Sequence, residues 1–165
     1  MLLSKVVAAL PALLRPVDGS PTSSELIKRD STEVIYLTGI LSPSNPPYYL
    51  GYVAYYPTTD LGYNLTEPNP ADEALGPFGG TALWNTWPTP CSGNTHYEIS
   101  FPSGVLFQVD INYGASSAAV GTVVGGGWNG YHGFTCVRDS ERVLYPVTGI
   151  DGSEVYSLIN CTRAA

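Results

Sequence analysis

The chain has 165 residues, and its 14 Asp and Glu against 7 Lys and Arg give a formal net charge of -7 at pH 7. Binding to nucleic acid and to anionic lipid depends on Lys and Arg side chains, so this balance disfavours DNA, RNA and bare membrane surfaces as partners. The length is sufficient for one domain with a hydrophobic core of its own.

Residues 1–19 have the pattern of a secretory signal. Lys5 precedes an apolar run from Val6 to Leu14, and small residues stand before Ser20, where a signal peptidase would cut. A membrane-spanning helix needs roughly 20 apolar residues, and Pro11 interrupts this shorter run. We therefore expect a removed leader, an extracellular location and no insertion into a membrane.

Residues 20–29 are polar and end in the dibasic pair Lys28-Arg29, which is typical of a site cut by processing proteases of the secretory route. The sequence thus predicts a signal peptide (1–19), a pro-segment (20–29) and a single β-rich domain (30–165). Of the seven basic residues, four lie before residue 30, so the mature chain would keep three arginines and no lysine.

The first two predicted strands run from Thr32 to Leu41 and from Tyr48 to Tyr56, because both are rich in β-branched and aromatic residues. The proline-rich stretch between them predicts a hairpin. Thr58 to Gly80 carries several prolines and glycines, so we expect a long surface loop with room for one helical turn at Ala71 to Leu75. The sequon at Asn64 in this loop predicts N-glycosylation.

A short strand is expected from Thr81 to Thr86, followed by the clearest hairpin of the chain, His96 to Phe101 with Val105 to Ile111. Along the second of these two runs apolar and polar residues alternate, which is typical of a strand with one buried side. Ala115 to Val124 fits a strand or a short helix, and the glycines at 125–127 are interpreted as a flexible connection that ends it.

Near the end of the chain, Tyr131 to Arg138 and Arg142 to Pro146 are expected to form a hairpin, and Glu154 to Cys161 a final strand. About nine strands, frequent turn residues and no amphipathic helix longer than a turn predict an all-β domain. The expected architecture is an antiparallel β-sandwich or a partly open barrel.

Three cysteines follow the leader, Cys91, Cys136 and Cys161, and they allow one intramolecular disulfide in three ways. We favour Cys136 with Cys161, because both lie in strand-like runs, whereas Cys91 lies in a proline-rich loop. The prediction requires the two Cα atoms to be about 4.4 to 6.8 Å apart. A bridged Cys161 would also hinder access to a second sequon, at Asn160.

The sequence carries no nucleophile-elbow, zinc-protease or phosphate-loop motif, so no cofactor and no metal are expected. His96 and Glu98 stand two residues apart in a strand and share a face, which suits either an acid–base pair or a solvent-facing side. His132 lies among glycines, where it fits either a turn or a functional role.

Three pieces of sequence resemble the fungal guanyl-specific ribonucleases and their non-catalytic secreted relatives among plant-pathogen effectors: residues 129–134, 141–145 and 160–162. The resemblance implies a ribonuclease-like hydrolase with Arg142 as the catalytic arginine. His96, Glu98 and His132 would then supply the base and the histidines. The layout as a whole, with a leader, a short pro-segment and one small domain, is similar to fungal small secreted proteins.

Trp84, Trp87 and Trp128 are candidates for an exposed aromatic surface that stacks on sugars or contacts a protein, although aromatic residues also pack in β-sheet cores. Our leading hypothesis is a secreted, non-enzymatic protein that binds a host or cell-wall protein or glycan. The alternatives are a ribonuclease-like hydrolase and a carbohydrate-binding module.

Overall fold

The computed structural model describes residues 33–41, 49–56, 66–75, 95–147 and 152–164. The predicted signal peptide, the pro-segment and the strand at 81–86 lie outside these residues. So do four individual residues for which predictions were made: Asn64, Trp84, Trp87 and Cys91.

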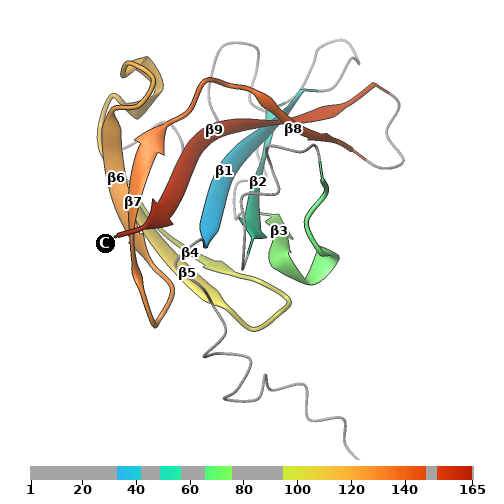
Figure 1. Cartoon of the computed structure of the whole chain (residues 1–165), viewed down its shortest axis with the longest axis horizontal. Helices are drawn as coiled ribbons and strands as arrows, with labels where there is room; N and C mark the ends of the chain where they lie inside the picture. Colours follow the sequence, from blue (N-terminus) through green and yellow to red (C-terminus); the bar gives the residue numbers. More distant parts are fainter. Residues whose placement is uncertain (1–32, 42–48, 57–65, 76–94, 148–151, 165) are drawn as a thin grey trace, which may run out of the picture.

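In the described residues, nine strands form one antiparallel sheet that curves into a nearly closed barrel (Figure 1). The order across the sheet is β3-β2-β1-β9-β7-β6-β5-β4, and β8 also pairs with β9. The bounds are β1 Val34–Leu41, β2 Tyr49–Tyr56, β3 Glu73–Leu75, β4 Thr95–Ser100, β5 Leu106–Ile111, β6 Val123–Trp128, β7 Gly133–Arg138, β8 Val143–Pro146 and β9 Glu154–Arg163. The prediction of an all-β domain is confirmed, and of the two expected architectures, a β-sandwich or a partly open barrel, the structure has the barrel.

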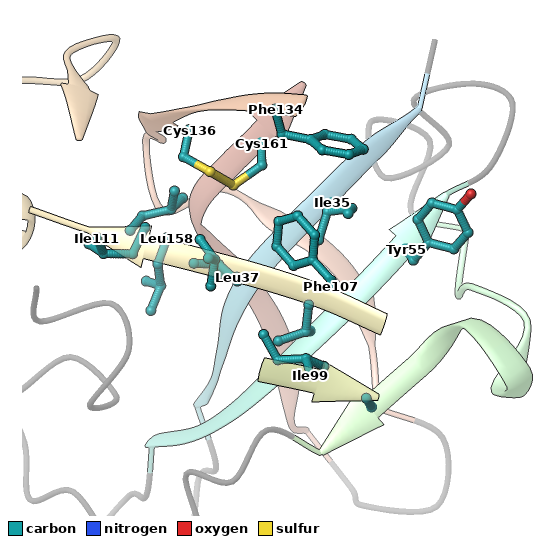
Figure 2. Close-up of a cluster of buried hydrophobic side chains, with 14 of the residues drawn as sticks. Ile35, Leu37, Tyr55, Ile99, Phe107, Ile111, Phe134, Cys136, Leu158 and Cys161 are labelled. Atoms are coloured by element: carbon teal, nitrogen blue, oxygen red, sulfur yellow. A yellow bond between two sulfur atoms is a disulfide. The ribbon is translucent and has the colours of Figure 1, made fainter. Parts of the chain in front are cut away.

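The interior of the barrel holds the larger hydrophobic core, to which inward-facing residues of most strands contribute (Figure 2). Ile35 and Leu37 enter it from β1, and Phe107 enters it from β5. The two ends of the sheet approach each other where the backbone N–H of Ser103 donates to the carbonyl oxygen of Ala71, 2.8 Å away. This contact links the β4–β5 turn to the segment before β3, so the sheet is nearly closed.

A second, smaller core lies on the other face of β1 and β2. Its buried members are Val34, Tyr36, Ile40, Ala54, Tyr56, Leu144, Tyr145 and Val155. Strand β1 is therefore buried on both faces, which agrees with its long run of β-branched and aromatic residues.

Two of the predicted hairpins are confirmed, β1 with β2 and β4 with β5. The final strand β9 lies between β1 and β7, so the C-terminal strand does return to the strand that carries Cys136. Directly opposite Cys136 in this pairing is Cys161, and the two sulfur atoms are bonded at 2.02 Å (Figure 2). Their Cα atoms are 4.0 Å apart, slightly closer than the expected range.

The predicted hairpin between residues 131–138 and 142–146 is wrong. Strands β7 and β8 lie end to end along the same edge of β9, with Arg138 opposite Ile159 and Val143 opposite Tyr156. The residues between them form a bulge rather than a turn. Asp139 holds this bulge together, because its buried carboxylate accepts hydrogen bonds from Ser157 Oγ at 2.5 Å and from the backbone N–H of Ser140 at 2.7 Å.

The interpretation of the glycines at 125–127 as a flexible connection is also wrong, because all three lie inside strand β6. A Cβ on Gly127 would stand 2.4 Å from Cζ of Phe107, and one on Gly125 would stand 2.2 Å from the carbonyl oxygen of Asp110. Glycine is required here because neighbouring atoms occupy the space where a side chain would begin. The residues before β6 form a short 3-10 helix, Ala115–Ser117, and turns.

In the part of the predicted loop that the structure describes, residues 66–75, a 3-10 helix lies at Pro70–Asp72 rather than a helical turn at Ala71 to Leu75. Asn69 caps it, since its side-chain oxygen accepts the N–H of Ala71 at 3.0 Å. The chain then becomes extended as β3, which pairs with β2.

Candidate ligand-binding site

A hollow of about 340 Å³ lies on the outer surface of the barrel, and its lining residues include members of β4, β5, β6 and β7. These four strands are neighbours in the sheet (Figure 1). Its lining consists of His96, Gln108, Asp110, Gly126, Gly127, Trp128, Gly133, Phe134 and Ala164. Small-molecule sites in proteins have volumes of roughly 300 to 1,000 Å³. We refer to this feature as the β4–β7 hollow, and its volume is that of a site for a small ligand.

The strand register explains why a hollow forms at this position. On the outer face, Asp110 lies opposite Gly126, and Trp128 lies opposite Gly133. Neither glycine has a side chain, and a Cβ on Gly133 would meet no heavy atom within 4 Å. Side chains are therefore missing at two nearby outward positions, while larger residues surround the gap.

Two cross-strand pairs of polar side chains lie at the β4–β5 side of the hollow. His96 Nδ1 and Asp110 Oδ1 are 2.9 Å apart. In the next row, Gln108 Nε2 donates to Glu98 Oε1 at 2.5 Å. His96 and Glu98 do share the exposed face of β4, as their spacing predicts, and each is paired with a residue of β5.

Two aromatic residues line the hollow, and of these Phe134 is buried while the side chain of Trp128 is half exposed. Trp128 ends β6 immediately before a tight turn, in which Asn129 Oδ1 accepts the backbone N–H groups of Tyr131 and His132 at 3.1 and 2.8 Å. Gly130 adopts a φ of +89°, which favours glycine. The turn thus fixes Trp128 beside the open space at Gly133.

His132 lies outside the hollow and contacts the start of β1. Its Nδ1 is 3.0 Å from Glu33 Oε2, and the other oxygen of Glu33 accepts a hydrogen bond from the hydroxyl of Tyr55 at 2.8 Å. The side chain of Glu33 is fully buried. Sequence reasoning missed Glu33, although its alternation with Ile35 and Leu37 already places it on the inward face of β1.

Arg142 belongs to the bulge between β7 and β8. Its Nε is 3.5 Å from Asp139 Oδ2, and its guanidinium carbon lies 5.3 Å from the centre of the Tyr36 ring. Burial by itself would raise the pKa of Asp139, but hydrogen bonds from Ser157, Ser140 and Asn160, together with the charge of Arg142, lower the pKa below its ordinary value. This cluster stabilises the bulge.

The four residues proposed for the hydrolase are thus engaged with five different partners, and no partner is shared between any two of them. His96 contacts Asp110, Glu98 contacts Gln108, His132 contacts Glu33, and Arg142 contacts Asp139 and Tyr36. Of the four, the β4–β7 hollow is lined by His96 alone. Within the described part of the chain, no group of three His, Cys, Asp or Glu residues is arranged to hold a metal ion.

The fold and the hollow define a small, disulfide-bonded, barrel-like β domain with a ligand-sized depression on its outer surface. No protein-family model, no curated protein and no solved structure matches the chain. Among the described residues there is no helix with the length and apolar character needed to span a membrane.

Proposed function

We propose that this chain is an extracellular, non-enzymatic binding protein and that the β4–β7 hollow is its ligand site. The observation that carries the proposal is the hollow itself, in which a half-exposed tryptophan stands beside two outward glycines. Exposed aromatic side chains next to convergent polar groups are typical of binding sites. The leader-like sequence and the disulfide support an extracellular location, because disulfides persist in oxidising compartments.

The proposal of binding without catalysis is supported by the way the reactive side chains are used. His132 and Glu33 tie the β6–β7 turn to β1, and Arg142 and Asp139 hold the bulge beside β9. Groups that make such structural contacts cannot leave them to act on a substrate without a cost in stability. Because the proposed location is extracellular, the partner we propose is a host or cell-wall component.

Filling the hollow tests the proposal. Gly133→Val adds a β-branched side chain where a Cβ meets no atom, so the variant should fold and should lose retention on cell-wall material. Tyr113→Ala is the matched control, because Tyr113 is an aromatic residue that is 88% exposed and does not line the hollow. Equal retention of both variants would contradict the proposal that the β4–β7 hollow is the ligand site. Turnover of RNA, glycan or peptide that disappears in His132→Ala would contradict the absence of catalysis.

A further inference from the structure

We infer that the β4–β7 hollow binds a single uncharged sugar ring of a glycan, stacked beside Trp128. The inference rests on the proposed function, since it names the ligand class for the same site. It follows from four properties of the hollow: its exposed aromatic residue, its mixture of hydrogen-bonding groups, its charge and its size.

The exposed aromatic residue offers an apolar surface of the right kind. A pyranose ring has apolar C–H faces and a polar edge of hydroxyl groups, so it packs its face against an aromatic ring and directs its edge to polar groups. Trp128 is 51% exposed and is held in place by its pairing with Gln108 on one side and Gly133 on the other. Gly133 lies opposite Trp128 in the strand pairing, and a Cβ there would meet no heavy atom within 4 Å, which leaves room for such a ring.

The polar groups of the hollow both donate and accept hydrogen bonds. Asp110 supplies carboxylate oxygens, His96 supplies ring nitrogens, and Gln108 supplies an amide with both functions. A sugar hydroxyl also donates and accepts, so it matches this mixture. The cross-strand pairs hold His96 and Gln108 in position before a ligand arrives, which lowers the entropy lost on binding.

The charge of the site selects against ions. No Asp, Glu, Lys or Arg stands between Asp110 and Arg138 in the sequence, a segment that includes all of β6 and most of β7. The lining contains no Lys or Arg that would hold a phosphate, sulfate or carboxylate, and its one carboxylate, Asp110, is already paired with His96. Both anionic and cationic ligands are therefore poorer matches than a neutral one.

The size of the hollow sets the extent of the contact. A volume of about 340 Å³ is near the lower end of the range for ligand sites, so it suits one ring rather than several. A ligand as small as one sugar ring is expected to bind with a dissociation constant on the order of 1 mM.

Titration by two-dimensional ¹H–¹⁵N NMR of the mature chain tests this inference. The probes are soluble oligosaccharides of β-glucan, chitin, xylan and mannan, with polygalacturonate as the anionic probe and oligolysine as the cationic one. At least one neutral oligosaccharide should give saturable shifts at the Trp128 indole N–H and at the amides of Gly126 and Gly133. Trp128→Ala and Gly133→Val should each raise the dissociation constant at least tenfold, Trp128→Phe should restore part of the binding, and Tyr113→Ala should leave it unchanged.

The other outcomes separate the inference from the proposed function. If no neutral oligosaccharide shifts these residues, the inference is wrong. If oligolysine or polygalacturonate shifts the same residues instead, the ligand class is wrong while the binding function stands. If a sugar binds but the shifts map to other residues and survive Gly133→Val, the hollow is not the ligand site. In that case both the inferred sugar site and the site named in the proposed function are wrong. Cleavage of the oligosaccharide during the titration would overturn the non-enzymatic function and leave the ligand class intact.

Discussion

Glu33 and Asp139 are the two buried acidic residues of the described chain, and each is held by several hydrogen-bonding partners. Glu33 joins β1 to β2 through Tyr55 and to the β6–β7 turn through His132. Because it links segments that are distant in sequence, it affects the stability of more than one hairpin.

We expect Glu33→Ala to lower the free energy of unfolding by about 1 to 3 kcal/mol, since it removes the contacts of the buried Glu33 carboxyl with the Tyr55 hydroxyl and with His132 Nδ1. Glu98→Ala is the control, because Glu98 is exposed and its hydrogen bond is with Gln108 on the neighbouring strand; its effect should be about 0.5 kcal/mol or less. Urea unfolding followed by circular dichroism measures both. Equal effects of the two variants would show that the Glu33 contacts are not stabilising.

Asp139 and Glu73 should give the stability opposite dependences on pH. The pKa of Asp139 is lower in the folded protein than in the unfolded chain, as described above. Its contribution to stability is therefore fully present above the unfolded-state pKa and is lost as the pH falls through the folded-state pKa. Burial raises the pKa of Glu73, and the hydrogen bond from Tyr145 offsets this only in part. Its contribution is present below the unfolded pKa and is lost as the pH rises through the folded pKa.

The measurement is the free energy of unfolding between about pH 2.5 and pH 7 for the wild type, Asp139→Asn and Glu73→Gln. Relative to the wild type, Asp139→Asn should become less stable as the pH rises, and Glu73→Gln should become more stable. At neutral pH the cost of Asp139→Asn should be about 1 to 3 kcal/mol, as for other buried charged hydrogen bonds. If the difference in free energy of unfolding from the wild type changed with pH in the same direction for both variants, the opposite pKa shifts of Asp139 and Glu73 would be contradicted.

At the scale of single strands, the glycines of β6 and β7 have different roles that substitution can separate. Gly127→Ala should destabilise the protein by about 1 to 3 kcal/mol, because its Cβ would overlap the ring of Phe107 in a packed core. Gly133→Ala places its Cβ in open space, so its effect should be near zero or stabilising by about 0.5 kcal/mol. Thermal unfolding of the two variants checks the difference, and similar melting temperatures would exclude the contact with Phe107 as the reason for Gly127.

The sequence predicted the strands better than their partners. Alternation along residues 105–111 locates β5 and its buried face, because the period of a strand is a local property. Nothing local shows that residues 139–142 bulge instead of turning, since Asp139, Ser140 and Glu141 have the composition of a hairpin loop. Their partner is β9, which is distant in sequence and supplies Ser157 to bind the Asp139 carboxylate.

The candidate site, like the strand partners, could be predicted only in part. The sequence suggested Trp128 and His96 as exposed residues. The hollow itself forms because Gly126 lies opposite Asp110, and Gly133 opposite Trp128, on the outer face. That placement depends on the register of three strands. From its composition, the glycine run 125–127 indicates a turn. It lies within β6 instead, where atoms of β5 leave no room for a Cβ on Gly125 or Gly127.

At the scale of the whole molecule, the disulfide covalently joins β7 to β9 within the core. Replacing both Cys136 and Cys161 by Ala should lower the free energy of unfolding by roughly 2 to 5 kcal/mol, because the bond restricts the unfolded chain. Denaturant unfolding of this variant and of the wild type measures the loss. Peptide mapping without reduction should recover Cys136 linked to Cys161, whereas a peptide linking Cys91 to either partner would contradict the pairing.

The position of β9 between β1 and β7 also determines when the protein can fold. One edge of β1 pairs with β2 soon after synthesis, but its other edge must wait for β9, which is more than a hundred residues later. At synthesis rates of about 5 to 20 residues per second, that edge stays open for on the order of ten seconds. An open strand edge is a template for pairing with other chains. Expression yield should therefore depend on how quickly the C-terminal strand is delivered and on whether chaperones cover β1 until it arrives.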